Sequence, residues 1–107
     1  MINSLIMTAL TPLGVPVYYL RYYGQAVPTY ITFYYYNEQG VAWAENEEIA
    51  TGYYVQVDVW SKTDFITLVE QVESAMKAAG FIRTSAIDFY EYDTQIYHRA
   101  IRFYYVT

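Results

Sequence analysis

The feature that most constrains the fold is the strict alternation of side chains between Tyr53 and Trp60. One set of alternate positions is Tyr53, Val55, Val57 and Val59, and the other set is Tyr54, Gln56, Asp58 and Trp60. A period of two residues predicts a β-strand, because successive side chains of a strand point to opposite faces of the sheet. The apolar set predicts a face that contacts the core. The amphipathic set suits water or another subunit.

Tyrosine is the residue that the 107-residue chain uses in excess. The chain contains 15 tyrosines, and 55% of its residues are hydrophobic when tyrosine is included. A tyrosine ring gains from burial, but its hydroxyl needs water or a hydrogen-bond partner. We therefore expect half-buried surfaces or subunit contacts rather than an unusually large core. The length is sufficient for a single domain over residues 1–107.

Charge and residue usage exclude several classes of site. Six basic and eleven acidic residues give a net charge of −5, which argues against a basic surface for nucleic acid. The absence of cysteine excludes disulfides, cysteine-ligated zinc and cysteine nucleophiles, and the single histidine, His98, excludes any site that needs two. Residues 1–10 lack the basic segment of a signal peptide, and no apolar run is long enough to span a membrane. We expect a soluble intracellular domain.

Two helices are predicted from apolar spacing. In residues 61–79 apolar side chains recur every three or four positions, which predicts a long amphipathic helix packed on one face of a sheet. Ser61–Asp64 has the pattern of a capping box at its start, and Gly80 fits the left-handed position that ends a helix. Residues 2–10 have the spacing of a second, short helix.

The remaining apolar segments predict strands. They are residues 17–23, 29–36, 53–60, 82–92 with a bulge near Thr84, and 95–106. The polar stretch 37–52 is predicted as a long loop, which in a small domain is usually functional or mobile. The order predicts an α+β fold with a mainly antiparallel sheet. The helices would cover one face, and the tyrosine-rich face would need a partner to cover it.

A search for catalytic groups finds little. His98 could act as a general base only beside a nucleophile and an orienting carboxylate, and the acidic residues across the final hairpin are Asp88, Glu91 and Asp93. No serine lies in a nucleophile-elbow context, so a solvated strand histidine is the expected reading. The sequence has no calcium-loop pattern and no glycine-rich phosphate loop. We predict no enzyme activity, no metal and no cofactor, and we keep open a groove for a carbohydrate or another small ligand on the tyrosine-rich face.

Eight residues are the candidates for an assembly interface. They are Trp43, Glu45, Glu47, Glu48, Tyr54, Trp60, Arg99 and Arg102. Aromatic residues and arginine are enriched where proteins contact one another. Trp43 lies in the Glu-rich stretch, where it either anchors a protein contact or folds back over the sheet. Arg99 and Arg102 are expected to pair with acidic residues of this chain or of a neighbouring chain.

Five segments carry a resemblance to a known family. They are residues 11–18, 28–33, 54–61, 75–81 and 90–99, in which Tyr90-Glu91-Tyr92-Asp93-Thr94 is followed by Tyr97-His98-Arg99. In this order they resemble the tail-completion, or tail-terminator, proteins of long-tailed (siphovirus-like) bacteriophages, over about residues 12–106. The resemblance rests on pattern and order rather than on a catalytic signature.

The resemblance implies a virion structural protein that assembles in the host cytoplasm into a homo-oligomeric ring, commonly a hexamer. Such a ring ends the tail tube at its head-proximal end and docks the head-tail connector, while DNA passes through the lumen without specific binding. It implies no enzyme activity, no cofactor and no membrane. An acidic lumen would repel DNA phosphates, and Glu45, Glu47 and Glu48 are candidates to line it. The alternatives are another ring component of the neck or tail, namely a connector adaptor or a tube subunit, and a small ligand-binding α+β domain.

Overall fold

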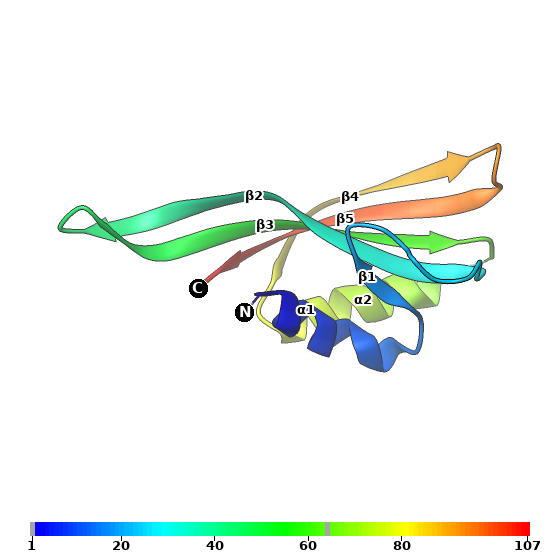
Figure 1. Ribbon diagram of the computed structural model, residues 1–107, viewed down its shortest axis with the longest axis horizontal. Helices are drawn as coiled ribbons and strands as arrows, with labels where there is room; N and C mark the ends of the chain where they lie inside the picture. The colour runs from blue at the N-terminus through cyan, green and yellow to red at the C-terminus, as the bar shows by residue number, and fades with distance from the viewer. Residues whose placement is uncertain (1, 64) are drawn as a thin grey trace.

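The computed structural model describes residues 2–63 and 65–107 and places two layers, a sheet and a pair of α-helices (Figure 1). The elements in chain order are α1 (Ile2–Leu10), the 3-10 helix η1 (Thr11–Leu13), β1 (Val17–Tyr19), β2 (Thr29–Ala44), β3 (Glu47–Ser61), α2 (Ile66–Ala78), β4 (Ile82–Glu91) and β5 (Ile96–Val106). Both α-helices lie on the same face of the sheet (Figure 1). The predicted α+β class and the short helix over residues 2–10 are confirmed.

The described strands form a five-stranded sheet of order β1-β2-β3-β5-β4. The pairs β2–β3, β3–β5 and β4–β5 are antiparallel, but β1 runs parallel to β2, with Val17 opposite Ile31. The sheet is therefore mixed, which corrects the mainly antiparallel sheet expected from the sequence. The parallel pair arises because β1 stops at Tyr19 and residues 20–28 carry the chain back before β2 begins.

The core lies between the helices and the sheet face that they cover, called here the inner face. Fully buried residues of the inner face are Ile31, Phe33, Val55, Val57, Val59, Ile101 and Phe103. Opposite them lie Ile6, Leu10, Val72 and Met76 of the helices, with Phe81 after α2. The three valines of β3 are those that the alternation predicted to face the core. Apolar burial of this kind is the main stabilising term in folding.

Helix α2 is shorter than predicted, with 13 residues instead of the 19 of residues 61–79. Ser61 is the last residue of β3, and its Oγ accepts a hydrogen bond from the backbone N–H of Thr63 at 3.1 Å, so it stabilises the turn before the helix. The carboxylate of the predicted capping box, Asp64, lies outside the described residues. The predicted end is confirmed, because Gly80 has φ +100° and the N–H of Phe81 donates to the carbonyl of Met76.

The largest difference from prediction is residues 37–52, which form strand rather than loop. Here β2 and β3 continue as a hairpin as far as a turn at Glu45 and Asn46, both of which have positive φ. Since β5 ends at Val106 opposite Gly52, the hairpin beyond that point has only two strands among the described residues. We call residues 37–52 the arm. It extends away from the helices and gives the molecule its long axis, 52 Å against 26 and 24 Å (Figure 1).

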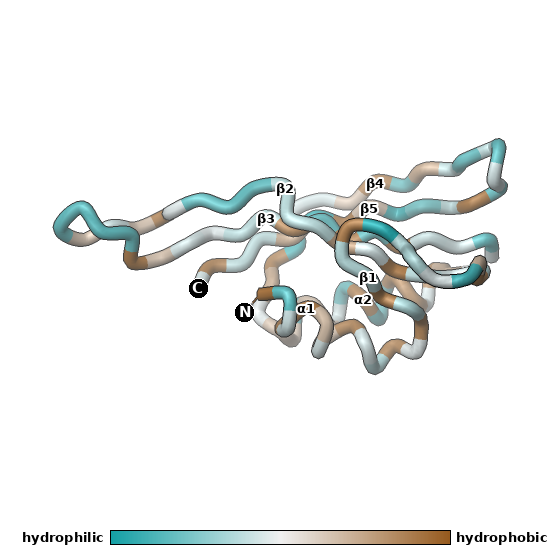
Figure 2. The backbone as a smooth tube through the Cα atoms, in the orientation of Figure 1, coloured by the Kyte–Doolittle hydropathy of each residue, from teal (hydrophilic) through white to brown (hydrophobic). Residues whose placement is uncertain are grey.

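The arm also differs from the body in polarity (Figure 2). It carries four glutamates and no basic side chain. In Figure 2 hydrophobic colour is prominent on the helices and on the strands beside them, whereas the β2 side of the arm is mainly hydrophilic. The sequence predictions are closer for β4 and β5, which begin and end within one residue of expectation, and the predicted bulge lies between Arg83 and Ser85. The strand predicted over residues 17–23 is shorter, because β1 ends at Tyr19.

Candidate assembly surfaces

The sheet face opposite the helices, called here the outer face, carries a row of stacked rings. Tyr30, Trp60, His98 and Phe89 are cross-strand neighbours on β2, β3, β5 and β4. The His98 ring lies 3.7 Å from Trp60 at an interplanar angle of 10°, and Tyr30 stacks on the opposite side of Trp60 at 5.9 Å. Phe89 lies 5.4 Å from His98 on its other side. The faces of Trp60 and His98 are thus occupied by neighbouring rings, so neither offers a free face on which a sugar could stack.

Beneath this row, four polar side chains are joined by hydrogen bonds. Asp58 Oδ1 lies 2.6 Å from His98 Nε2 and accepts a bond of 2.8 Å from Gln56 Nε2. Arg102 Nε donates to Gln56 Oε1 at 3.1 Å. Asp58 is only 4% exposed although both described α-helices lie on the other face, because the larger side chains around it exclude water. A buried polar group of this kind needs its partners, so the chain of bonds fixes the arrangement of the face.

The expectation that His98 is a solvated strand histidine is therefore wrong. Its side chain is 14% exposed and is held between two aromatic rings. Its carboxylate partner is Asp58, from β3, rather than Asp88, Glu91 or Asp93 across the hairpin. The sequence does not reveal this pair, because it depends on the register between β3 and β5. The one indication in the sequence is that Asp58 is a charged residue in the middle of a predicted strand, between two valines that face the core.

A second aromatic group lies on the outer face toward the arm. Tyr54 contacts Tyr104 at 4.8 Å and Tyr36 at 5.8 Å, and the guanidinium of Arg102 lies 4.3 Å above the Tyr36 ring. Three predicted interface residues, Tyr54, Trp60 and Arg102, are thus brought together on one face. Arg102 binds Gln56 and the Tyr36 ring there. A cation over a ring contributes about 0.5–1 kcal/mol at an exposed site.

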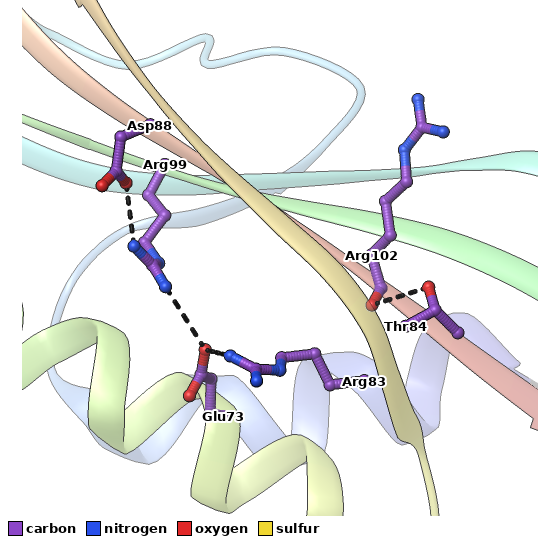
Figure 3. A network of polar contacts seen from close by, with 6 residues as sticks. All are labelled: Glu73, Arg83, Thr84, Asp88, Arg99 and Arg102. Carbon is purple, nitrogen blue, oxygen red and sulfur yellow. Dashed lines mark hydrogen bonds and ion pairs between the residues drawn. The ribbon is translucent and has the colours of Figure 1, made fainter.

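Arg99 lies on the opposite side of β5 and joins the sheet to α2 (Figure 3). Its guanidinium is 2.9 Å from Asp88 and 3.9 Å from Glu73, and Glu73 also pairs with Arg83 at 3.0 Å. Arg99 therefore pairs with acidic residues of its own chain. Exposed pairs of this kind contribute about 0–1 kcal/mol each, so their main effect is to fix the helix against the β4–β5 hairpin. A cavity of about 580 Å³ lies beside this network, between α2 and the hairpin.

The other four predicted interface residues lie on the arm. Trp43 is 59% exposed and does not fold back over the body of the sheet. Glu45 is in the turn, and Glu47 and Glu48 begin β3 beside it. Ile49 is exposed as well. An isolated two-stranded hairpin is marginally stable in water, so the arm gains most if another protein surface packs against it.

A cavity of about 790 Å³ lies where the arm joins the body, and we call it the root cavity. Its lining comes from α1 and from the inner-face side of β2, β3 and β5: Ile2, Asn3, Ser4, Leu5, Thr8, Tyr35, Glu38, Tyr53, Tyr105 and Thr107. Burial, together with the nearby Tyr19 and Glu38, raises the pKa of Tyr35 to about 12. The phenol of Tyr35 therefore stays protonated at any physiological pH. The sequence alone does not reveal this cavity, because its residues come from four separate elements.

Two further findings concern residues 2–63 and 65–107. They contain no group of three or more histidine, aspartate or glutamate side chains placed to hold a metal ion. None of their helices is both long enough and apolar enough to cross a membrane.

Comparison with known proteins gives a likeness of fold. No protein-family model matches the sequence, and no curated protein matches it. Among solved structures, a chain from the virion of a native gene transfer agent particle is similar, with a TM-score of 0.53 and 12% sequence identity. The match covers 92% of this chain and 81% of that chain. At this identity the two chains are alike in fold.

Proposed function

We propose that this protein is a structural subunit of a phage-like particle, and specifically a tail-terminator subunit that forms a ring at the head-proximal end of the tail tube. The observation that carries the proposal is the arm, an acidic two-stranded ribbon with an exposed tryptophan. A monomer gains little from such a ribbon, whereas a neighbouring subunit packed against it would complete it. The likeness in fold to a chain of a gene transfer agent virion supports the same class.

A ring requires two different surfaces on each subunit, because a head-to-tail contact closes only if one patch meets another. The arm and the remainder of the molecule supply two such surfaces at opposite ends of a 52 Å axis. In this proposal the ring binds the tail tube on one side and the head-tail connector on the other, and DNA passes through it without specific binding. The proposal includes no catalytic step, no cofactor and no membrane.

A second candidate is another ring component of the same particle, a connector adaptor or a tube subunit. The arm favours this candidate too, since a long hairpin also suits a subunit that stacks on its own copies. The two are separated by assembly of the purified protein, followed by light scattering and negative-stain electron microscopy. A terminator forms closed single rings and caps added tail tubes, whereas a tube subunit grows into long tubes.

The test in the particle is deletion of the gene. The expected result is unjoined heads together with tails of abnormal length. Normal tails of fixed length on filled heads would contradict the proposal. A monomer whose melting temperature rises with a small ligand would instead favour a ligand-binding domain.

A further inference from the structure

The cavity of about 580 Å³ between α2 and the β4–β5 hairpin, called here the helix–hairpin cavity, is lined by large apolar side chains that water reaches. Ile66 of α2 is 63% exposed and Tyr97 of β5 is 45% exposed. The Phe65 ring stacks on the Tyr97 ring at 5.9 Å, so the apolar lining is continuous from the start of α2 to the sheet. Exposed apolar surface of this kind marks a place where another protein surface packs.

The rim of the helix–hairpin cavity is acidic. Its lining includes Glu70 and Glu73 of α2 and Asp88 of β4, and Arg99 is its one basic residue. Arg99 already pairs with Asp88 and Glu73. Glu70 is exposed and belongs to no ion pair among the described residues. The cavity therefore suits an apolar surface that carries a basic side chain within reach of Glu70.

Only one of the six basic residues of the chain meets this description. Three of the six are held by hydrogen bonds to side chains of their own chain, namely Arg83, Arg99 and Arg102. Of the other three, Lys62 and Lys77 have no large exposed hydrophobic side chain within two positions in the described sequence. Arg21 follows Leu20, which is 58% exposed, and precedes Tyr23, which is 62% exposed. It is also the single charged residue between positions 2 and 37.

The segment around Arg21 is held in a fixed conformation. The N–H of Leu20 donates to the carbonyl of Phe33 at 2.8 Å, and the N–H of Arg21 donates to the carbonyl of Tyr19 at 2.9 Å. Leu20 has φ +71°, which is uncommon for leucine and persists where the surrounding structure enforces it, often at functional sites. The Arg21 guanidinium lies 4.7 Å above the Tyr23 ring. A surface that is already ordered loses less entropy when it binds.

The segment and the cavity lie toward opposite edges of the sheet. Leu20 directly follows β1, which is one edge strand, whereas the cavity lies against the hairpin that contains β4, the other edge strand. Four strand spacings separate the two edges, about 19 Å, so the two patches of one chain do not meet. We propose that Leu20, Arg21 and Tyr23 of one copy dock in the helix–hairpin cavity of the next copy, where Arg21 pairs with Glu70. This contact is head-to-tail, as a ring needs, and it rests on the proposed function.

The test reverses each charge in a separate variant, Arg21→Glu and Glu70→Arg. Each purified variant is expected to need at least a tenfold higher concentration than the wild type to associate, as measured by light scattering. In an equimolar mixture of the two variants every contact again joins an acidic and a basic residue. The mixture should therefore associate within about threefold of the wild-type concentration. Restoration on mixing requires that the contact lies between copies, because neither variant carries both changes.

Lys62→Glu is the matched control, since it reverses a basic residue that lacks the apolar neighbours of Arg21. Its mixture with Glu70→Arg is expected to associate no better than Glu70→Arg alone. Circular dichroism checks that each variant is folded, and the milder Arg21→Gln and Glu70→Gln should each weaken association at least threefold.

Three results would overturn this contact and leave the proposed function standing. The first is normal association of Arg21→Glu or Glu70→Arg, and the second is a mixture of the two that stays as weak as its components. The third is normal rings that no longer join heads to tails, which would assign the cavity to another protein of the particle. A wild-type protein that stays monomeric at every concentration, and also in the presence of tail tubes, would overturn both the contact and the proposed function.

Discussion

Nε2 of His98 lies 2.6 Å from Oδ1 of Asp58, on the sheet face opposite the two α-helices. The Asp58 carboxylate also accepts a hydrogen bond from Gln56, so it joins β3 to β5 within the outer face. The pair is buried by the stacked rings around it rather than by a second layer. The outer face is thus internally ordered in the single subunit. The arm, by contrast, is paired with β5 only at its root, where Gly52 lies opposite Val106.

The first prediction is that Asp58→Ala destabilises the fold by about 3 kcal/mol, because it leaves the buried partners His98 and Gln56 without their acceptor. The measurement is urea denaturation followed by tryptophan fluorescence. The matched control is Asp88→Ala, which removes the exposed partner of Arg99 and is expected to cost 1 kcal/mol or less, about the value of a surface pair. Equal costs for the two variants would show that Asp58 does not support the outer face.

The second prediction concerns Trp43, whose side chain is largely exposed on the arm. Trp43→Ala is expected to change the free energy of unfolding by no more than about 0.5 kcal/mol, as is usual for a surface residue, yet to abolish ring assembly as measured by light scattering. Trp60→Ala is the comparison, because Trp60 stacks on His98 and donates to Thr32, and its loss should cost about 3 kcal/mol. A large loss of stability with Trp43→Ala would mean that the arm packs against the body in solution.

The third prediction concerns two glycines with positive φ. Gly80 has φ +100° and an added Cβ would lie 3.2 Å from Tyr105 Cε1, whereas Gly14 has φ +83° and open space around it. Gly80→Ala should therefore cost about 2 kcal/mol, for backbone strain and crowding together, and Gly14→Ala about 1 kcal/mol for strain alone. Thermal unfolding of both variants gives the comparison. Equal values would show that Tyr105 moves aside freely.

The sequence predicts a helix or strand most accurately where its apolar side chains recur with one period and face the core. The valines of β3 and the apolar side chains of α2 have such periods, and both elements form where expected, although α2 begins later because Ser61 belongs to β3. The arm was predicted as a loop because its glutamates, asparagine and glycines have low β-propensity. Its strands form nevertheless, since β2 and β3 are already paired in the body and the hairpin continues their antiparallel pairing, with register shifts after Tyr35 and on both sides of Ala42.

The candidate sites depend on the order of the strands in the sheet and on the register between them, and the sequence reveals neither. The parallel β1–β2 pair and the root cavity each need elements from distant parts of the chain. In the same way, Asp58 meets His98 only when β3 and β5 are aligned. Trp43 and its neighbouring glutamates were predicted as interface residues from their types and from the polar stretch that contains them, and they lie together on the exposed arm. Their part in assembly remains a prediction for the variants above.

The last prediction uses the pKa of Tyr35, which burial raises to about 12 in the folded chain, against about 10 in an unfolded one. The folded state therefore holds this proton more tightly than the unfolded state. The stability that this proton contributes is fully present below pH 10 and is lost as the pH rises from 10 to 12, since the unfolded chain loses the proton first.

Urea midpoints of the wild type should fall more steeply between pH 9 and pH 11.5 than those of Tyr35→Phe. Tyr92→Phe, at an exposed tyrosine of the β4–β5 turn, is the matched control and should follow the wild type. If wild type and Tyr35→Phe differ by the same amount at both pH values, the hydroxyl of Tyr35 is not buried in solution, and the root cavity is more open than the structure shows.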